Sequence, residues 1–197
     1  VLVGMLWSVA NVGTDAVNGA EGAGKVAAAL CTLILIYAAF PIAQVVRSAG
    51  DSLAASKSKM VDFFFKDFIV ANIKALGHIT ALVALFGAIC STVGLAFGTG
   101  GMSLDPALYG GFEYAYALPI DAMAAFMGML GLEFVGGFLN DFFTWDLATS
   151  DATGHNLDAV FALGWKYVQV VLILAKLYVA IAFYHFFWGV LNTFFNW

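Results

Sequence analysis

The sequence predicts an all-α integral membrane protein, on the basis of its composition and of three long apolar runs. The 197 residues are 62% hydrophobic and only 11% charged, whereas soluble domains are usually about 45–50% apolar and about 25% charged. A water-soluble fold could not bury so much apolar surface, so part of it must face lipid. Within lipid, a single segment can pair all of its backbone groups only as a helix. We therefore expect one membrane domain over residues 1–197.

The three predicted transmembrane helices cover residues 26–46, 75–97 and 165–188. Each run has about the 20 apolar residues that a helix needs to cross the hydrocarbon core. Trp165 and Trp188 bound the third run and would be about 35 Å apart in a helix, which matches a bilayer because tryptophan favours its two interfaces. The opening VLVGMLWSVANV is typical of a signal remnant or of an earlier span, and the sequence leaves both open.

A fourth hydrophobic run, residues 120–143, is ambiguous. It has the length of a span, but it contains several glycines and carries Glu133 near its centre. A central acid costs on the order of 2.5–3 kcal/mol on insertion scales. The run is therefore expected to be re-entrant, interfacial or spanning.

Basic residues are concentrated between the first two spans. Five of the eight lie there: Arg47, Lys57, Lys59, Lys66 and Lys74. Eight of the thirteen acids lie between residues 98 and 164, a segment with no basic residue. The positive-inside rule therefore places residues 47–74 on the cytoplasmic side or its equivalent. It keeps residues 98–164 on the other side, which favours a re-entrant or surface-lying helix over a fourth span.

The loop after the first span predicts an amphipathic interfacial helix over about residues 57–73, on the cytoplasmic side. Its sequence, KSKMVDFFFKDFIVANIK, combines phenylalanines with charges. Asp62 and Lys66 are one helical turn apart and can pair on a wet face. Such a helix would lie in the interface and lead into the second span. A docking surface for a partner is the alternative.

Small residues form a packing seam along the second span. Their 4-3-4-3 spacing places five of them on one helical face: Gly77, Ala81, Ala84, Ala88 and Ser91. Small side chains let a second helix approach closely, and such contacts drive helix association in lipid. Whether that helix belongs to this chain or to another is open. Cys31 and Cys90 lie in apolar runs and are expected to be packing residues without a disulfide.

Two histidines, His78 and His185, lie near the predicted cytoplasmic ends of the second and third spans. Alone, each is most simply a hydrogen-bonded interfacial side chain. As a pair in one leaflet they could bind a haem between them, or each could hold a tetrapyrrole. His185 also belongs to a stripe that is more polar than its surroundings and should face protein. The stripe consists of Tyr167, Val171, Leu174, Tyr178, Ala182, His185, Gly189 and Asn192.

Lys176 lies at the middle of the third span, where a charged ammonium is costly and should face protein or a cavity. Glu133 is the one acid central to an apolar run, so we expect these two residues to form an intramembrane charge pair. Asp121 and Asp141 flank the same run and are the next candidates. The pair would fix helix register or, as an alternative, form the site of a small transporter or channel.

The sequence predicts no catalytic residue, and the net charge of −5 gives no indication of nucleic-acid binding. Asp151, His155 and Asp158 are weak metal candidates without the regular spacing of an EF-hand. The function predicted best is that of a small helical subunit, with bound lipid. It would pack with other membrane subunits or with copies of itself in a larger complex. A haem- or tetrapyrrole-binding redox or pigment subunit and a small transporter are the alternatives.

Overall fold

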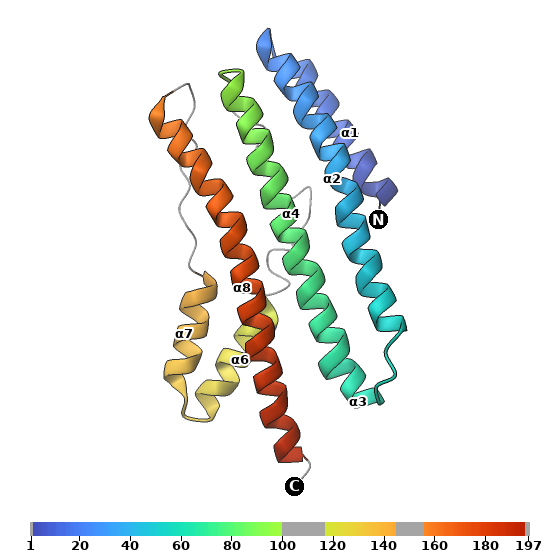
Figure 1. The fold of residues 1–197 in the computed structure, drawn as a ribbon, viewed down its shortest axis with the longest axis vertical. Coiled ribbons are helices and arrows are strands. Elements are labelled where there is room, and N and C mark those ends of the chain that lie inside the picture. Colours follow the sequence, from blue (N-terminus) through green and yellow to red (C-terminus); the bar gives the residue numbers. More distant parts are fainter. Residues whose placement is uncertain (1, 100–116, 145–155, 196–197) are drawn as a thin grey trace. The chain divides into compact units, whose positions relative to one another are not determined.

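The computed structural model describes residues 2–99, 117–144 and 156–195, which are 90% helical and contain no strand among them (Figure 1). This confirms the predicted all-α class. The helices are α1 (Leu2–Gly19), α2 (Ala23–Ala54), α3 (Met60–Asp62), the π-helical segment η1 (Phe63–Phe68), α4 (Ile69–Ala96), α6 (Ala117–Met129), α7 (Glu133–Thr144) and α8 (Leu157–Phe195).

Three helical stretches are long and apolar enough to cross a membrane: Ala23–Ala54, Met60–Ala96 and Leu157–Thr193. They overlap the three predicted spans and are longer, as fits an integral membrane protein. The second and third have 37 residues each, which is about 55 Å of helix against a hydrocarbon core of about 30 Å. Several turns of each stretch therefore extend beyond the hydrocarbon.

The residues expected to form an interfacial helix, about 57–73, lead into the second span without a break. α3, η1 and the first turns of α4 follow one another directly from Met60 onward. In η1 the backbone hydrogen bonds reach one residue further than in an α-helix, a local widening that is frequent at functional sites.

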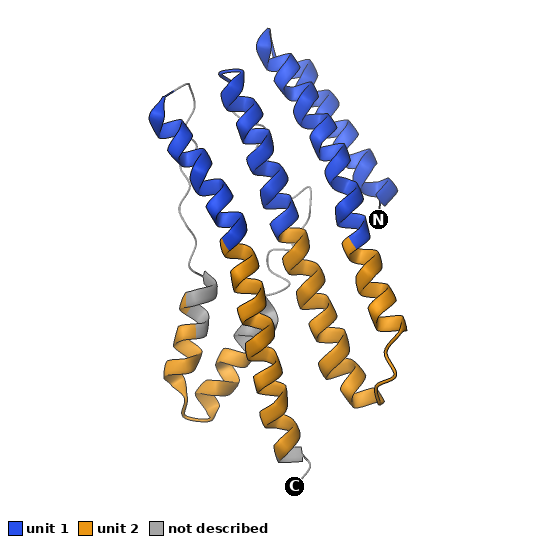
Figure 2. Cartoon of the chain, viewed as in Figure 1, with its two compact units in different colours: residues 1–44, 81–110, 147–171 blue, residues 45–80, 111–146, 172–197 orange. Residues whose placement is uncertain are grey.

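The chain divides into two compact units, coloured separately in Figure 2. Unit 1 comprises residues 1–44, 81–110 and 147–171, and unit 2 comprises residues 45–80, 111–146 and 172–197.

The core of unit 1 joins α1, α2 and α4. Its buried residues are Val9, Cys31, Leu35, Ala38, Phe86 and Cys90. Both thiols are free and buried, and the Cys31 Sγ lies 3.6 Å from the Cys90 carbonyl oxygen. The cysteines therefore act as small packing residues, as the sequence predicts.

The core of unit 2 forms where α4 and α8 pack against each other and against α6. Its buried residues are Val70, Ile73, Met123, Leu177, Ala180, Ile181 and Tyr184. The two long helices are antiparallel here: Leu177 lies against Gly77, and Tyr184, two turns further along α8, reaches back to Phe65.

Residues 120–143 form parts of two helices, α6 and α7, which Figure 1 shows as a hairpin. At the end of α6 the N–H groups of Gly131 and Leu132 donate to carbonyls of the last turn at 3.0 and 2.9 Å. This Schellman pattern needs a left-handed residue, and Gly131 supplies it with a φ of 76°. α7 then begins with Glu133, an acid in the first turn, where the helix dipole favours negative charge. With 13 and 12 residues, neither helix has the about 20 residues that one span needs.

Gly136 lets α7 lie directly against α6. A Cβ at Gly136 would come within 2.7 Å of the Ala124 carbonyl oxygen, whereas a Cβ at Gly137 would meet nothing within 4 Å. We expect Gly136→Ala to destabilise the protein by about 1–3 kcal/mol, the usual cost of overpacking. Gly137→Ala should be neutral or stabilising by about 0.5–1 kcal/mol. Thermal denaturation in one detergent compares them, and equal midpoints would mean that the helices do not touch at Gly136.

Candidate functional site

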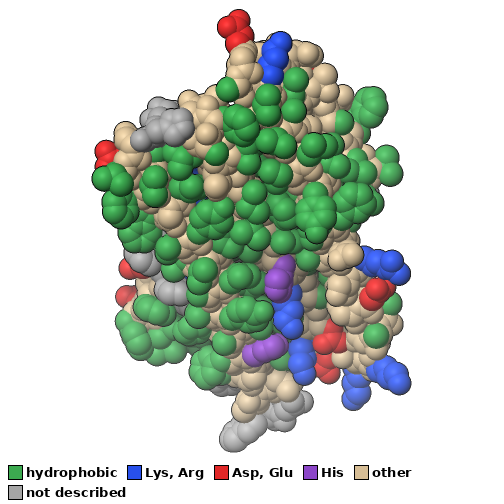
Figure 3. All heavy atoms as spheres, turned by 45° about the horizontal axis from the view of Figure 1, so that its top comes forward, with side chains coloured by type: hydrophobic (Ala, Val, Ile, Leu, Met, Phe, Trp, Pro, Cys, Tyr) green, Lys and Arg blue, Asp and Glu red, His purple; other side chains and the backbone are tan. Residues whose placement is uncertain are grey.

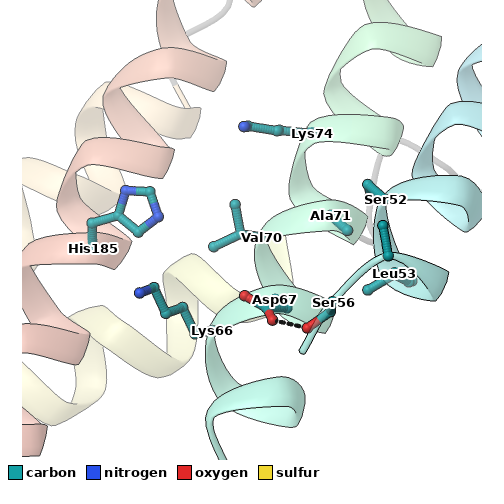
Figure 4. A pocket seen from close by; sticks show the side chains of 10 residues that line it. Ser52, Leu53, Ser56, Lys66, Asp67, Val70, Ala71, Lys74 and His185 are labelled. Carbon is teal, nitrogen blue, oxygen red and sulfur yellow. Dashed lines mark hydrogen bonds between the residues drawn. The ribbon is translucent and has the colours of Figure 1, made fainter. Parts of the chain in front are cut away.

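A polar pocket of about 300 Å³ lies in unit 2. Three segments line it: the end of α2 with the residues after it, the stretch from η1 into α4 that soon follows, and α8, whose His185 lies more than 100 residues further along the chain. Its polar side chains are Ser52, Ser56, Lys66, Asp67, Lys74 and His185 (Figure 4).

Three basic side chains face this pocket. Lys66 in η1 and Lys74 in α4 extend toward the same space as the His185 ring from α8, with Val70 between the two lysines (Figure 4). Neither lysine forms an ion pair with a carboxylate in the part of the chain that the structure describes. Figure 3 shows histidine and basic side chains grouped together, with acidic side chains next to them, beside a surface that is largely hydrophobic.

The acid that lines the pocket is held by hydroxyl groups. The Oδ2 atom of Asp67 accepts a hydrogen bond from the Ser56 hydroxyl and a second, 2.6 Å long, from the Ser58 hydroxyl. These bonds tie the segment that follows α2 onto η1. They also direct the Asp67 carboxylate toward the serines. The carboxylate keeps its negative charge, so the two lysines leave the pocket with an excess of positive charge.

Aromatic contacts set the position of the basic side chains. Tyr184 in α8 donates its hydroxyl hydrogen bond to the Phe65 carbonyl oxygen, and the rings of Phe65 and Trp188 stack with centroids 5.6 Å apart and planes 5° from parallel. Phe65 directly precedes Lys66, and Tyr184 directly precedes His185. Because Tyr184 is held against Phe65, the residues that follow them, His185 and Lys66, reach the same pocket.

His78 and His185 do not lie at one level of the helices. The Nδ1 atom of His78 donates to the Lys74 carbonyl oxygen at 2.6 Å, and its ring meets the ring of Tyr178 edge-on with centroids 6.4 Å apart. His185 comes seven residues after Tyr178, which is about 10 Å further along α8. The sequence did not predict that His185 joins Lys66 and Lys74. Tetrapyrrole binding by either histidine stays a prediction.

Lys176 is buried in unit 2, with only 4% of its surface exposed, in the environment that its central position in the span predicts. Glu133 is exposed at the first residue of α7. Asp141 is exposed near the end of α7, and the side chain of Asp121 lies outside the described part. The pairing of Lys176 with Glu133 stays a prediction.

The residues of the predicted packing seam lie on the side of α4 that meets α8 at both ends of the seam. In unit 2, a Cβ at Gly77 would come within 2.4 Å of a methyl carbon of Leu177. In unit 1, Ala81 and Ala88 are buried and Ala84 is half-buried. Ser91 accepts a 3.2 Å hydrogen bond from the Lys166 ammonium. A helix of this same chain is therefore a neighbour of the seam.

The weak metal candidates are described only in part. Asp151 and His155 lie outside the described residues, and Asp158 is exposed in the first turn of α8. Over residues 2–99, 117–144 and 156–195, no three metal-ligating side chains gather at one point.

No protein-family model, curated protein or solved structure matches this chain. Its function must therefore be inferred from its own residues and contacts. The basic pocket, the exposed face of α8 and the buried Lys176 are the features that bear on it.

A double-mutant cycle tests the predicted charge pair. Lys176→Met or Glu133→Gln alone should cost up to several kcal/mol, because each leaves the other charge unpaired, and the double change should recover much of that loss. We therefore expect a coupling above about 1 kcal/mol in thermal denaturation. Asp158→Asn, which also removes a first-turn acid, is the matched control and should be additive with Lys176→Met. Additivity of the Lys176 and Glu133 changes would assign Lys176 a different partner.

Proposed function

We propose that this chain is a small helical subunit that packs within a larger membrane protein complex. One observation carries the proposal: in unit 2 the exposed face of α8 bears Tyr178, Ala182, His185 and Gly189. Polar side chains within membrane segments usually face protein or water, and small residues let another helix approach closely. This face is better suited to a neighbouring helix than to lipid.

The opposite face of α8 is already used inside the chain. Leu177, Ala180, Ile181 and Tyr184 are buried against α4 and α6. Within unit 2 the stripe that the sequence assigns to a protein contact meets α4 edge-on through Tyr178 and His78, while Ala182, His185 and Gly189 stay exposed. A partner from another chain, either a different subunit or a second copy, would supply the missing helix.

The same proposal includes a re-entrant hairpin. Met123 of α6 packs with Val70, at the beginning of α4, and with Tyr184, near the end of α8. The chain leaves α4 at its other end, after Ala96, and starts α8 at Leu157. A segment that departs from one end of a spanning helix and packs at the opposite end before α8 begins is consistent with a deep re-entrant hairpin, one that reaches the level of Val70 before the chain returns to start α8. Residues 57–73 would then lie at the cytoplasmic interface.

One observation favours the tetrapyrrole alternative. Because the Nδ1 atom of His78 donates to a backbone carbonyl, its Nε2 atom is left with the lone pair that a metal requires. A visible absorption band in the purified protein that is lost in His78→Ala would favour this alternative over a purely structural subunit.

Assembly is expected to depend on the exposed face of α8. Ala182→Leu should disrupt co-purification with partners in mild detergent, because the added bulk pushes two helices apart. Leu33→Phe enlarges another exposed side chain, on α2 (62% exposed), and should leave assembly intact. Both variants should melt at about the temperature of the unaltered subunit. Retained assembly in Ala182→Leu would mean that this face meets lipid.

Sidedness is tested by labelling single cysteines with a membrane-impermeant reagent. Cysteines introduced at Lys57 and at Ser150 should react from opposite sides of sealed vesicles. The positive-inside rule places Lys57 on the cytoplasmic side, and a single span between the two positions would place Ser150 on the other side. The parent protein is the control, because its own thiols, Cys31 and Cys90, are buried. Reaction of both introduced cysteines from one side would show that residues 120–143 cross the membrane.

A further inference from the structure

We propose that the pocket in unit 2 binds a phosphate group, carried either by an anionic lipid headgroup or by a soluble phosphate. Lys66, Lys74 and His185 are its principal ligands. This assigns the pocket a ligand in addition to the packing role proposed for the chain, and it does not depend on that role.

The charge of the pocket selects an anion. Two ammonium groups and an imidazole border it, while its carboxylate, Asp67, is engaged by the hydroxyls of Ser56 and Ser58. The positive charges are thus not consumed by an ion pair among the described residues. An anion would gain charge-assisted hydrogen bonds from both lysines.

The arrangement of donors suits a phosphate better than a single-point anion. Lys66 and Lys74 lie eight residues, or about two turns, apart on one helical stretch, and His185 comes from α8 on the other side of the space (Figure 4). A phosphate has several acceptor oxygens and can bond donors that converge from different directions. The volume of about 300 Å³ is at the lower end of small-ligand sites and exceeds the need of one phosphate, so part of a headgroup fits as well.

The apolar surroundings favour a lipid as the source of the phosphate. Leu53, Val70 and Ala71 also line the pocket. Around it, η1 and the turn before it expose apolar side chains, with Met60 77%, Phe64 49% and Phe68 43% exposed. Basic pockets between membrane helices, on the side rich in lysine and arginine, are typical headgroup sites. An acyl chain beside these phenylalanines would cover surface that water would otherwise contact.

The experiment uses the full chain, purified in neutral detergent and titrated with short-chain phosphatidic acid while its thermal midpoint and its lipid-bound fraction by native mass spectrometry are recorded. We expect saturable binding and a midpoint that rises with lipid concentration. Lys66→Gln, Lys74→Gln and His185→Gln should each weaken binding about tenfold, the effect of losing one charge-assisted hydrogen bond. Lys74→Arg should retain most of the affinity because it keeps the charge.

Two matched controls distinguish binding in the pocket from a general attraction between the basic residues and the anionic lipid. Lys57→Gln and Lys59→Gln remove the same charge from the short connection between α2 and α3. Neither residue lines the pocket, so each should change the affinity less than about twofold. All five glutamine variants replace exposed side chains, so their midpoints without lipid should stay near that of the parent protein. Unchanged midpoints without lipid would show that a loss of binding is not caused by a loss of the fold.

Inorganic phosphate, added alone and as a competitor, identifies the source of the group. If phosphate neither raises the midpoint nor displaces the lipid at millimolar concentration, the pocket takes a lipid headgroup. If phosphate does both, and the pocket variants lose the effect, the pocket takes a soluble phosphate. The proposal is overturned if neither ligand binds, or if Lys57→Gln and Lys59→Gln weaken binding as much as the three pocket variants.

Discussion

The close packing contact between Leu177 and Gly77 sets the position of α8 along α4 in unit 2. The absence of a Cβ at Gly77 lets Leu177 lie this close, since a Cβ there would come within 2.4 Å of a Leu177 methyl carbon. Two turns further along α8, the same register brings the Tyr184 hydroxyl to the Phe65 carbonyl oxygen. It then places His185 beside the pocket that Lys66 and Lys74 border. The place of His185 at the pocket thus depends on an apolar contact about 12 Å away along α8.

Lipid imposes a second constraint, which explains where the polar groups are found. The 37-residue helices are longer than the hydrocarbon core, so the turns around Lys66 and Lys74 can stay hydrated while the rest of the same stretch is apolar. Hydroxyl groups inside the helices bond to carbonyls one turn back, as Thr80 does with Leu76 at 3.0 Å. The lysines of the pocket lie in these end turns, where their ammonium groups can reach water and lipid headgroups.

The sequence predicted the three long helices and the free cysteines, because hydrophobicity and length are local properties. It did not resolve residues 120–143, since a hydropathy window averages over the break at Gly131. The sequence did contain a signal for this break. Gly131 can end one helix, and Glu133, two residues later, is an acid suited to the first turn of the next. The pocket was missed for a different reason. His185 meets Lys66 and Lys74 only through the packing of α8 on the stretch from η1 into α4, and no spacing along the chain encodes that packing.

His185 connects the two surfaces on which the functional proposals are based. Its ring borders the basic pocket, and its backbone position belongs to the exposed face of α8 with Tyr178 and Ala182. A phosphate bound by this ring would therefore lie at the edge of the surface that a partner helix would cover. Any effect that a partner helix has on phosphate affinity must then be matched by an equal effect of phosphate on the affinity for the partner, because thermodynamic linkage is reciprocal. His185 is the residue through which such a coupling would act.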